Sequence, residues 1–134
     1  MKKLETQDII NVATDYLATR DDIIFAYLFG SYAKEKQTHL SDIDVAVYMK
    51  DDTQAFDNKL GILSDLTRLL ETDNIDLVVL NDAPISLLTN ILANKTILID
   101  QDPPVRHAFE SLKMRMGFDF SVLEKRILER RFSI

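Results

Sequence analysis

The chain has 134 residues, the size of one domain, and its 46% hydrophobic and 28% charged residues are typical of an ordinary soluble globular protein. It contains no cysteine, which excludes disulfide frameworks, zinc–thiolate sites, iron–sulfur clusters and thiol nucleophiles. Sixteen Lys and Arg against 22 Asp and Glu give a net charge of −6, so stable binding to nucleic acid or to an anionic membrane is not expected.

Charge and hydropathy are also informative about location and domain number. Residues 1–6 lack the apolar run of a signal peptide, and no apolar stretch is long enough to cross a membrane, so we expect a cytoplasmic protein. Residues 1–100 carry 9 basic and 17 acidic side chains, whereas residues 101–134 carry 7 basic and 5 acidic ones. Because 34 residues are too few for a separate core, we expect one domain over 1–134 with a mildly basic tail.

Hydrophobic spacing predicts helices and strands that alternate along the chain. Residues 5–19 carry apolar side chains every three or four positions, as a helix does, and residues 23–29 form a buried strand that ends at Gly30. A short helix over 31–37 and an alternating strand over 43–47 follow. The remaining expected elements are a helix over 54–71, strands over 75–80 and 96–99, a helix opened by Pro84, and two helices over 104–116 and 119–131 that Gly117 separates.

This order of elements predicts an α/β or α+β fold, with a mixed sheet of about four strands backed by helices. In the helical tail, a stripe of apolar residues is expected to pack in the core: Val105, Phe109, Leu112 and Met116. Residues 118–134 combine aromatic and aliphatic side chains with Lys125, Arg126, Arg130 and Arg131. This segment is expected either to dock a protein partner, since aromatic residues and arginine favour interfaces, or only to cover the sheet.

Three aspartates are the main candidates for chemistry. Asp42 and Asp44 are two apart at the start of a strand, so they project from the same face, where paired carboxylates can bind Mg²⁺. The alternative is a polar strand entry. Asp76 begins an apolar strand, and if the two strands are neighbours the three carboxylates converge. Such a group is typical of a two-metal phosphoryl or nucleotidyl transfer site, where one carboxylate can also accept a proton.

The turn after the first strand is the second candidate. Gly30 permits close approach of a ligand, and Ser31 with the free N–H groups of a following helix could contact a phosphate. A simple strand-to-helix turn with a serine cap is the alternative. Lys34 could attract a triphosphate or be a solvated surface lysine. The spacing matches neither a P-loop nor a dinucleotide-binding glycine motif, so ATPases and dehydrogenases of those kinds are unsupported.

Together these residues resemble the polymerase-β-like nucleotidyltransferase superfamily, and most closely its minimal nucleotidyltransferase (MNT) branch. Gly30-Ser31, ten further residues and Asp42-Ile43-Asp44 have the spacing of the family pattern, and the similarity continues through residues 75–84 to residues 100–102. The resemblance implies the polymerase-β-like fold. This chain differs from many members of the branch at Glu35, where they carry glycine. The phosphate role of Lys34 is therefore left open.

The resemblance also implies roles for individual residues. Gly30 and Ser31 would contact the nucleotide triphosphate, with Lys34 beside them. Asp42 and Asp44 would bind Mg²⁺, with two ions expected. Asp76 would complete the metal site and assist deprotonation of the attacking hydroxyl.

Small members of this branch are usually antitoxins encoded beside a HEPN-domain ribonuclease toxin, and they transfer AMP from ATP to a tyrosine of that toxin. The resemblance therefore predicts a Mg²⁺-dependent protein adenylyltransferase that forms a hetero-oligomer with such a toxin. Two alternatives remain. The protein could neutralise the toxin by binding alone, or it could modify a small molecule, although 134 residues leave little room for an acceptor domain.

Overall fold

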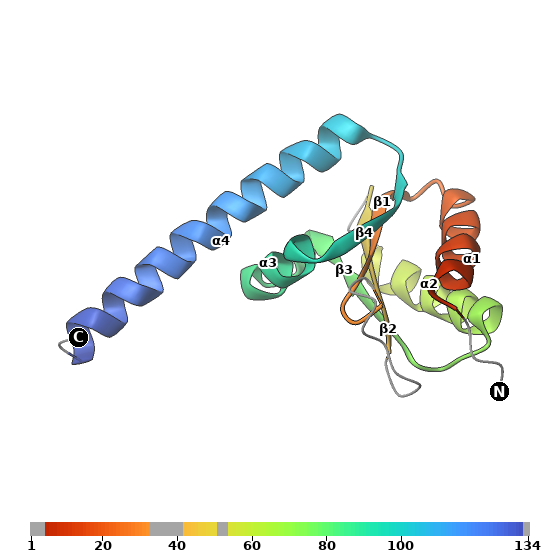
Figure 1. Cartoon of the computed structure of the whole chain (residues 1–134). Helices are drawn as coiled ribbons and strands as arrows, with labels where there is room; N and C mark the ends of the chain where they lie inside the picture. The colour runs from red at the N-terminus through yellow and green to blue at the C-terminus, as the bar shows by residue number, and fades with distance from the viewer. Residues whose placement is uncertain (1–4, 33–41, 51–53, 133–134) are drawn as a thin grey trace.

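The computed structural model describes residues 5–32, 42–50 and 54–132, and it confirms the four expected strands. Of the expected helix over 31–37, residues 31 and 32 form a turn and the others lie outside the described residues. Figure 1 labels all the elements except the 3₁₀ turn. In chain order they are α1 (Thr6–Ala18), β1 (Ile23–Phe29), β2 (Ile43–Met49), α2 (Ala55–Leu70), β3 (Ile75–Val79), the 3₁₀ turn η1 (Leu80–Asp82), α3 (Ile85–Ala93), β4 (Lys95–Asp100) and α4 (Pro103–Phe132).

The four strands form one mixed sheet in the order β3-β2-β1-β4. β1 is antiparallel to both β2 and β4, while β2 and β3 are parallel. β1 lies in the interior of the sheet and is flanked by helices on both faces, which explains its continuous apolar sequence. The predicted mixed α/β architecture is therefore confirmed.

Side chains alternate between two hydrophobic clusters, one on each face of the sheet. Val45 and Val47 of β2 pack with α1 and α2, while Ala46 and Tyr48 belong to the cluster that includes residues of α3 and α4. Because strand residues two apart share a face, Asp44 projects on the same side as Ala46 and Tyr48. The candidate carboxylate of β2 is thus on the face that α3 and α4 cover.

The C-terminal part of the chain differs from the prediction. α4 is one continuous helix of 30 residues, and Gly117 lies within it and does not end it. A Cβ atom at Gly117 would lie only 2.1 Å from Cγ2 of Thr89 in α3. The glycine therefore serves the close crossing of α3 and α4, a tertiary requirement that local sequence does not show.

The first half of α4 is fixed to the sheet by apolar and polar contacts. Phe109 packs against the rings of Phe25 and Tyr48 at centroid distances of 5.5 Å and 5.0 Å. The Arg106 guanidinium donates to Asp100 at 2.7 Å and to Glu110 at 2.9 Å. Glu110 also accepts a 2.6 Å hydrogen bond from the hydroxyl of Tyr27 on β1. These contacts hold residues 105–110 in place and so set the direction in which the helix continues.

The predicted core stripe is correct only for its first half. Val105 and Phe109 pack in the cluster, but Leu112 and Met116 are exposed. Beyond Gly117 the helix projects away from the body, so it cannot cover the sheet (Figure 1). Within residues 5–32, 42–50 and 54–132, every helix is too short or too polar to span a lipid bilayer.

The close contact of Gly117 with Thr89 predicts that Gly117→Ala changes the stability of the protein in opposite directions with and without the Thr89 side chain. Alone, Gly117→Ala brings a methyl group against Thr89 and should lower the free energy of unfolding by about 1 kcal/mol, because overpacking outweighs helix propensity. With Thr89→Ala the nearest remaining atom is the Cβ of residue 89, at 3.5 Å. In that background Gly117→Ala should stabilise the protein by up to about 1 kcal/mol. Urea unfolding of the four proteins measures both values.

Candidate active site

The three candidate aspartates come from neighbouring strand starts at one edge of the sheet. Asp44 of β2 is paired with Phe29, the last residue of β1, and with Asp76, the second residue of β3. Asp42 directly precedes β2. The predicted neighbourhood of these two strands is confirmed, and the parallel register places Asp44 and Asp76 side by side on the same face of the sheet.

Gly30 brings the turn after β1 against Asp44. Its φ of +72° lies in the left-handed region, which glycine adopts without strain. A Cβ at this position would lie 2.2 Å from Oδ2 of Asp44, so a larger residue would displace the carboxylate. The Gly30-Ser31 turn and the Asp42-Ile43-Asp44 segment, separated by ten residues in sequence, are therefore in direct contact.

Burial and like charges perturb Asp44. Burial is the larger cause, and repulsion from Asp76 and Asp42 adds to it, so that the pKa of Asp44 is raised to about 6. Within the described part of the chain, none of these three carboxylates forms an ion pair with Lys or Arg. The edge therefore carries concentrated negative charge that its described neighbours do not neutralise.

This set of carboxylates fits a hard divalent cation, although the three side chains do not form the expected ready-made metal site. Among the described side chains, no group of three or more His, Cys, Asp or Glu is arranged to hold a metal as it stands. Asp42 and Asp76 are exposed, as repulsion between like charges favours. Carboxylate oxygens are the ligands that Mg²⁺ prefers, and a cation would offset the repulsion on Asp44.

The other predicted site residues have different outcomes. Gly30 and Ser31 are partly buried in the turn beside Asp44. Lys34 and Glu35 lie outside the described residues. Tyr32 packs against the α1 and α2 cluster. The sequence pattern does not distinguish Asp42 from Asp44, whereas in the structure Asp44 is half-buried and lies against Gly30. The glycine at the end of the preceding strand is the sequence signal that could have indicated this contact.

The sequence model of the family described as "Polymerase beta, Nucleotidyltransferase" matches residues 11–104. No curated protein matches the chain.

Solved structures match over nearly the whole chain. A chain of a toxin–antitoxin complex with AMP-PNP is 25% identical, with a TM-score of 0.71, covering 95% of this chain and 98% of that chain. A chain of a mutant toxin–antitoxin complex containing MntA is also 25% identical, with a TM-score of 0.69 and coverages of 96% and 98%. A chain from the complex of tri-AMPylated Shewanella oneidensis HEPN toxin with an MNT antitoxin is 20% identical, with a TM-score of 0.67 and coverages of 90% and 97%, and it supports the fold alone.

The raised pKa of Asp44 predicts a stability change whose sign depends on pH. The folded pKa of about 6 lies above the unperturbed value of 3.8, so the folded state binds this proton more tightly. The contribution is therefore stabilising at low pH and is lost as the pH rises through about 6. With EDTA present, Asp44→Asn should raise the free energy of unfolding by about 1–2 kcal/mol above pH 7, after allowance for solvent screening.

This gain should disappear as the pH falls towards 4, because the wild-type carboxyl is then protonated as well. Urea unfolding across this pH range measures the effect. Asp119→Asn, on the exposed surface of α4, is the matched control and should show no such trend. An equal gain from Asp44→Asn at every pH would contradict the electrostatic explanation.

Proposed function

Because the chain belongs to the polymerase beta nucleotidyltransferase family, we propose that it is a Mg²⁺-dependent protein adenylyltransferase that acts as an antitoxin. It transfers AMP from ATP to a tyrosine of a partner HEPN ribonuclease toxin. The observation that carries the proposal is the contact of Gly30 with Asp44, with Asp76 in register on the next strand. The turn proposed to bind phosphate therefore lies beside the carboxylates proposed to bind metal.

Two observations support the choice of nucleotide and partner. A chain 25% identical to this one, aligned over nearly its whole length, belongs to a toxin–antitoxin complex with AMP-PNP, an analogue of ATP. The resemblance of the stretch from Gly30 to Asp44 to minimal nucleotidyltransferases supports adenylylation of a HEPN toxin. We further propose that residues 1–134 act as one domain in the cytoplasm, in a hetero-oligomer with the toxin.

The proposed roles come from the family resemblance, and the geometry of the edge is compatible with those of the described residues. Gly30 and Ser31 face the triphosphate, and Lys34 is a further candidate for that contact. Asp42, Asp44 and Asp76 would hold Mg²⁺, which supplies neutralisation of phosphate charge. The tyrosine oxygen forms a bond to the α-phosphorus of ATP while the bond from that phosphorus to the bridging oxygen breaks. Pyrophosphate leaves, and Asp76 takes the phenolic proton.

Removal of one carboxylate separates catalysis from binding. Asp44→Asn preserves the shape of the side chain but removes its charge, so AMP transfer should fall by roughly three orders of magnitude or more. Toxin affinity should change little, because docking surfaces extend over many residues. The toxin's intact mass after incubation with ATP and Mg²⁺ measures transfer, and a pull-down measures binding.

Asp15→Asn, on the exposed surface of α1 at the other face of the sheet, is the control and should transfer at the wild-type rate. If wild-type protein adds no AMP to the toxin, adenylylation is not its activity. If Asp44→Asn protects cells as well as wild type does, neutralisation by binding alone replaces the enzymatic proposal.

Metal and nucleotide binding can be measured without the toxin. A ligand that binds only the folded state raises the melting temperature, so saturating ATP with Mg²⁺ should raise it by roughly 5–10 °C. ATP with EDTA should have a much smaller effect, and Asp42→Asn should reduce the response to ATP with Mg²⁺. A full response from Asp42→Asn would show that Asp42 is not a ligand.

A further inference from the structure

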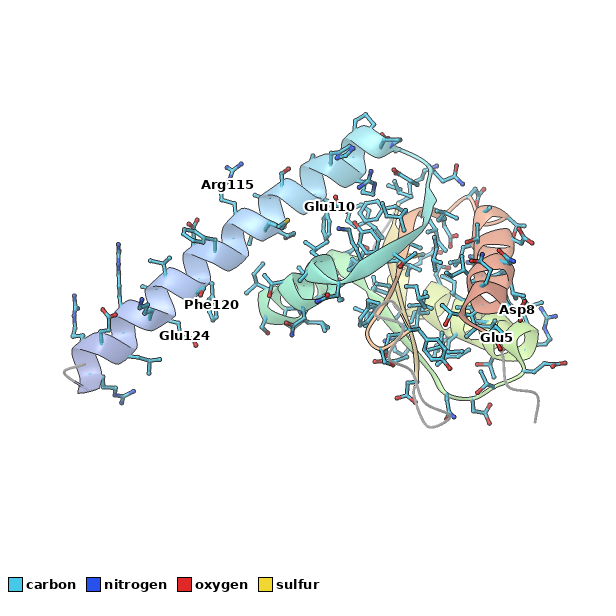
Figure 2. All side chains as sticks on the ribbon, viewed as in Figure 1. Glu5, Asp8, Glu110, Arg115, Phe120 and Glu124 are labelled. Carbon is cyan, nitrogen blue, oxygen red and sulfur yellow. The ribbon has the colours of Figure 1, made fainter. Side chains whose placement is uncertain are left out.

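The far half of α4, residues 118–131, projects from the body, and we call it the arm. Figure 2 shows Phe120 and Glu124 on the arm well clear of the sheet. At 1.5 Å per residue its 14 residues span about 21 Å. Most of its large apolar side chains are exposed, in contrast to those of residues 105–109, which pack against the sheet. An exposed row of this kind marks an interaction surface.

The apolar residues of the arm continue the stripe that begins in the core. Val105, Phe109, Leu112 and Met116 recur every three or four positions, and the same spacing leads on to three arm residues: Phe120, Leu123 and Ile127. We call the exposed members within the arm, Phe120, Leu123 and Ile127, the arm stripe. One face of the helix is therefore apolar throughout, and its own chain covers that face only at Val105 and Phe109.

We propose that the arm stripe is the docking surface for the HEPN toxin. It is separate from the edge of the sheet that carries Asp42, Asp44 and Asp76, which we call the catalytic edge. This inference rests on the function proposed above. The structural match to the AMP-PNP-bound toxin–antitoxin complex covers 95% of the 134 residues, which leaves only about 7 residues unaligned. Most of the 30-residue α4 is therefore included in that match, so the long helix is shared with a chain found in a toxin complex.

The position of the arm suits delivery of an acceptor. α4 packs on the same face of the sheet from which Asp44 projects. Its far half projects from the body (Figure 1), so a protein bound along the arm lies on the face of the sheet from which Asp44 projects. A docking surface away from the reacting atoms can hold the toxin while its tyrosine enters the catalytic edge.

Charge specifies the chemistry of the partner. Arg126, Arg130 and Arg131 line a groove beside Leu123 and Ile127. Residues 1–100 carry an excess of eight acidic side chains, whereas the arm carries four basic and three acidic ones, with its three arginines gathered beside Leu123 and Ile127. An acidic surface is therefore repelled by the body and attracted by the arginine-bearing end of the arm. The toxin surface that fits is an apolar helix face bordered by Asp or Glu. Self-pairing of two arms is less favoured, because the arm stripe spans less than the three to four heptads of a stable coiled coil.

Two double variants test the docking surface with matched chemistry. Leu123→Gln with Ile127→Gln alters the arm stripe, where the two side chains are 56% and 52% exposed. Met114→Gln with Phe118→Gln is the control, with exposures of 57% and 68%. Each control residue is nine positions from its counterpart, about two and a half turns, and so lies on the opposite side of α4. Glutamine keeps helix propensity in both.

Binding to the purified HEPN toxin is measured by titration calorimetry without nucleotide. The stripe variant should raise Kd at least about tenfold, while the control stays within about twofold of wild type. Equal affinities of the two variants overturn the docking proposal, as does a wild-type chain that fails to bind. Circular dichroism of both variants should retain the wild-type helical signal.

Two further readouts separate the possible explanations. Wild-type protein that binds the toxin but adds no AMP refutes the enzymatic function and leaves the docking surface supported. Light scattering tests a second copy as the occupant. A wild-type dimer that the stripe variant converts to a monomer, with unchanged toxin affinity, assigns the arm stripe to self-association and overturns the proposal.

Discussion

The contact between the Gly30 backbone and the Asp44 carboxylate organises the edge of the sheet that we propose as the active site. Since Oδ2 of Asp44 occupies the space that a Cβ on Gly30 would fill, the turn after β1 and the start of β2 are held together. The strand register then places Asp76 beside Asp44. The burial and repulsion that this arrangement creates at Asp44 are the cost of gathering carboxylates, and a hard cation would offset them.

Much of this edge could be predicted from the sequence. β1, β2 and β3 could be predicted because their apolar run, their alternation and their initial aspartate are local sequence patterns, and the folded structure retains them. The family resemblance indicated that Gly30, Ser31 and the aspartates act together. Register could not be predicted in the same way, because it depends on which strands become neighbours. The difference between half-buried Asp44 and exposed Asp42 follows from that register and from the position of Gly30.

α4 shows where local reasoning fails. Gly117 looked like a helix end because glycine commonly ends helices, but here it is required by the Thr89 side chain of another helix. The apolar stripe looked like core because periodicity does not reveal whether anything lies opposite it. Val105 and Phe109 meet the sheet, whereas Leu123 and Ile127 extend beyond it. Both errors come from tertiary geometry, which a single helix cannot encode.

The attachment of α4 at only one end has an evolutionary consequence. Arg106 and Glu110 carry the polar contacts that attach the helix to the fold, and both lie before Gly117. Residues beyond that point contribute little buried surface, so they can change without loss of the folded state. Partner choice and chemistry are therefore inherited on separate parts of the chain. A lineage can exchange its arm, and with it the protein it recognises, while the nucleotide-binding edge remains the same.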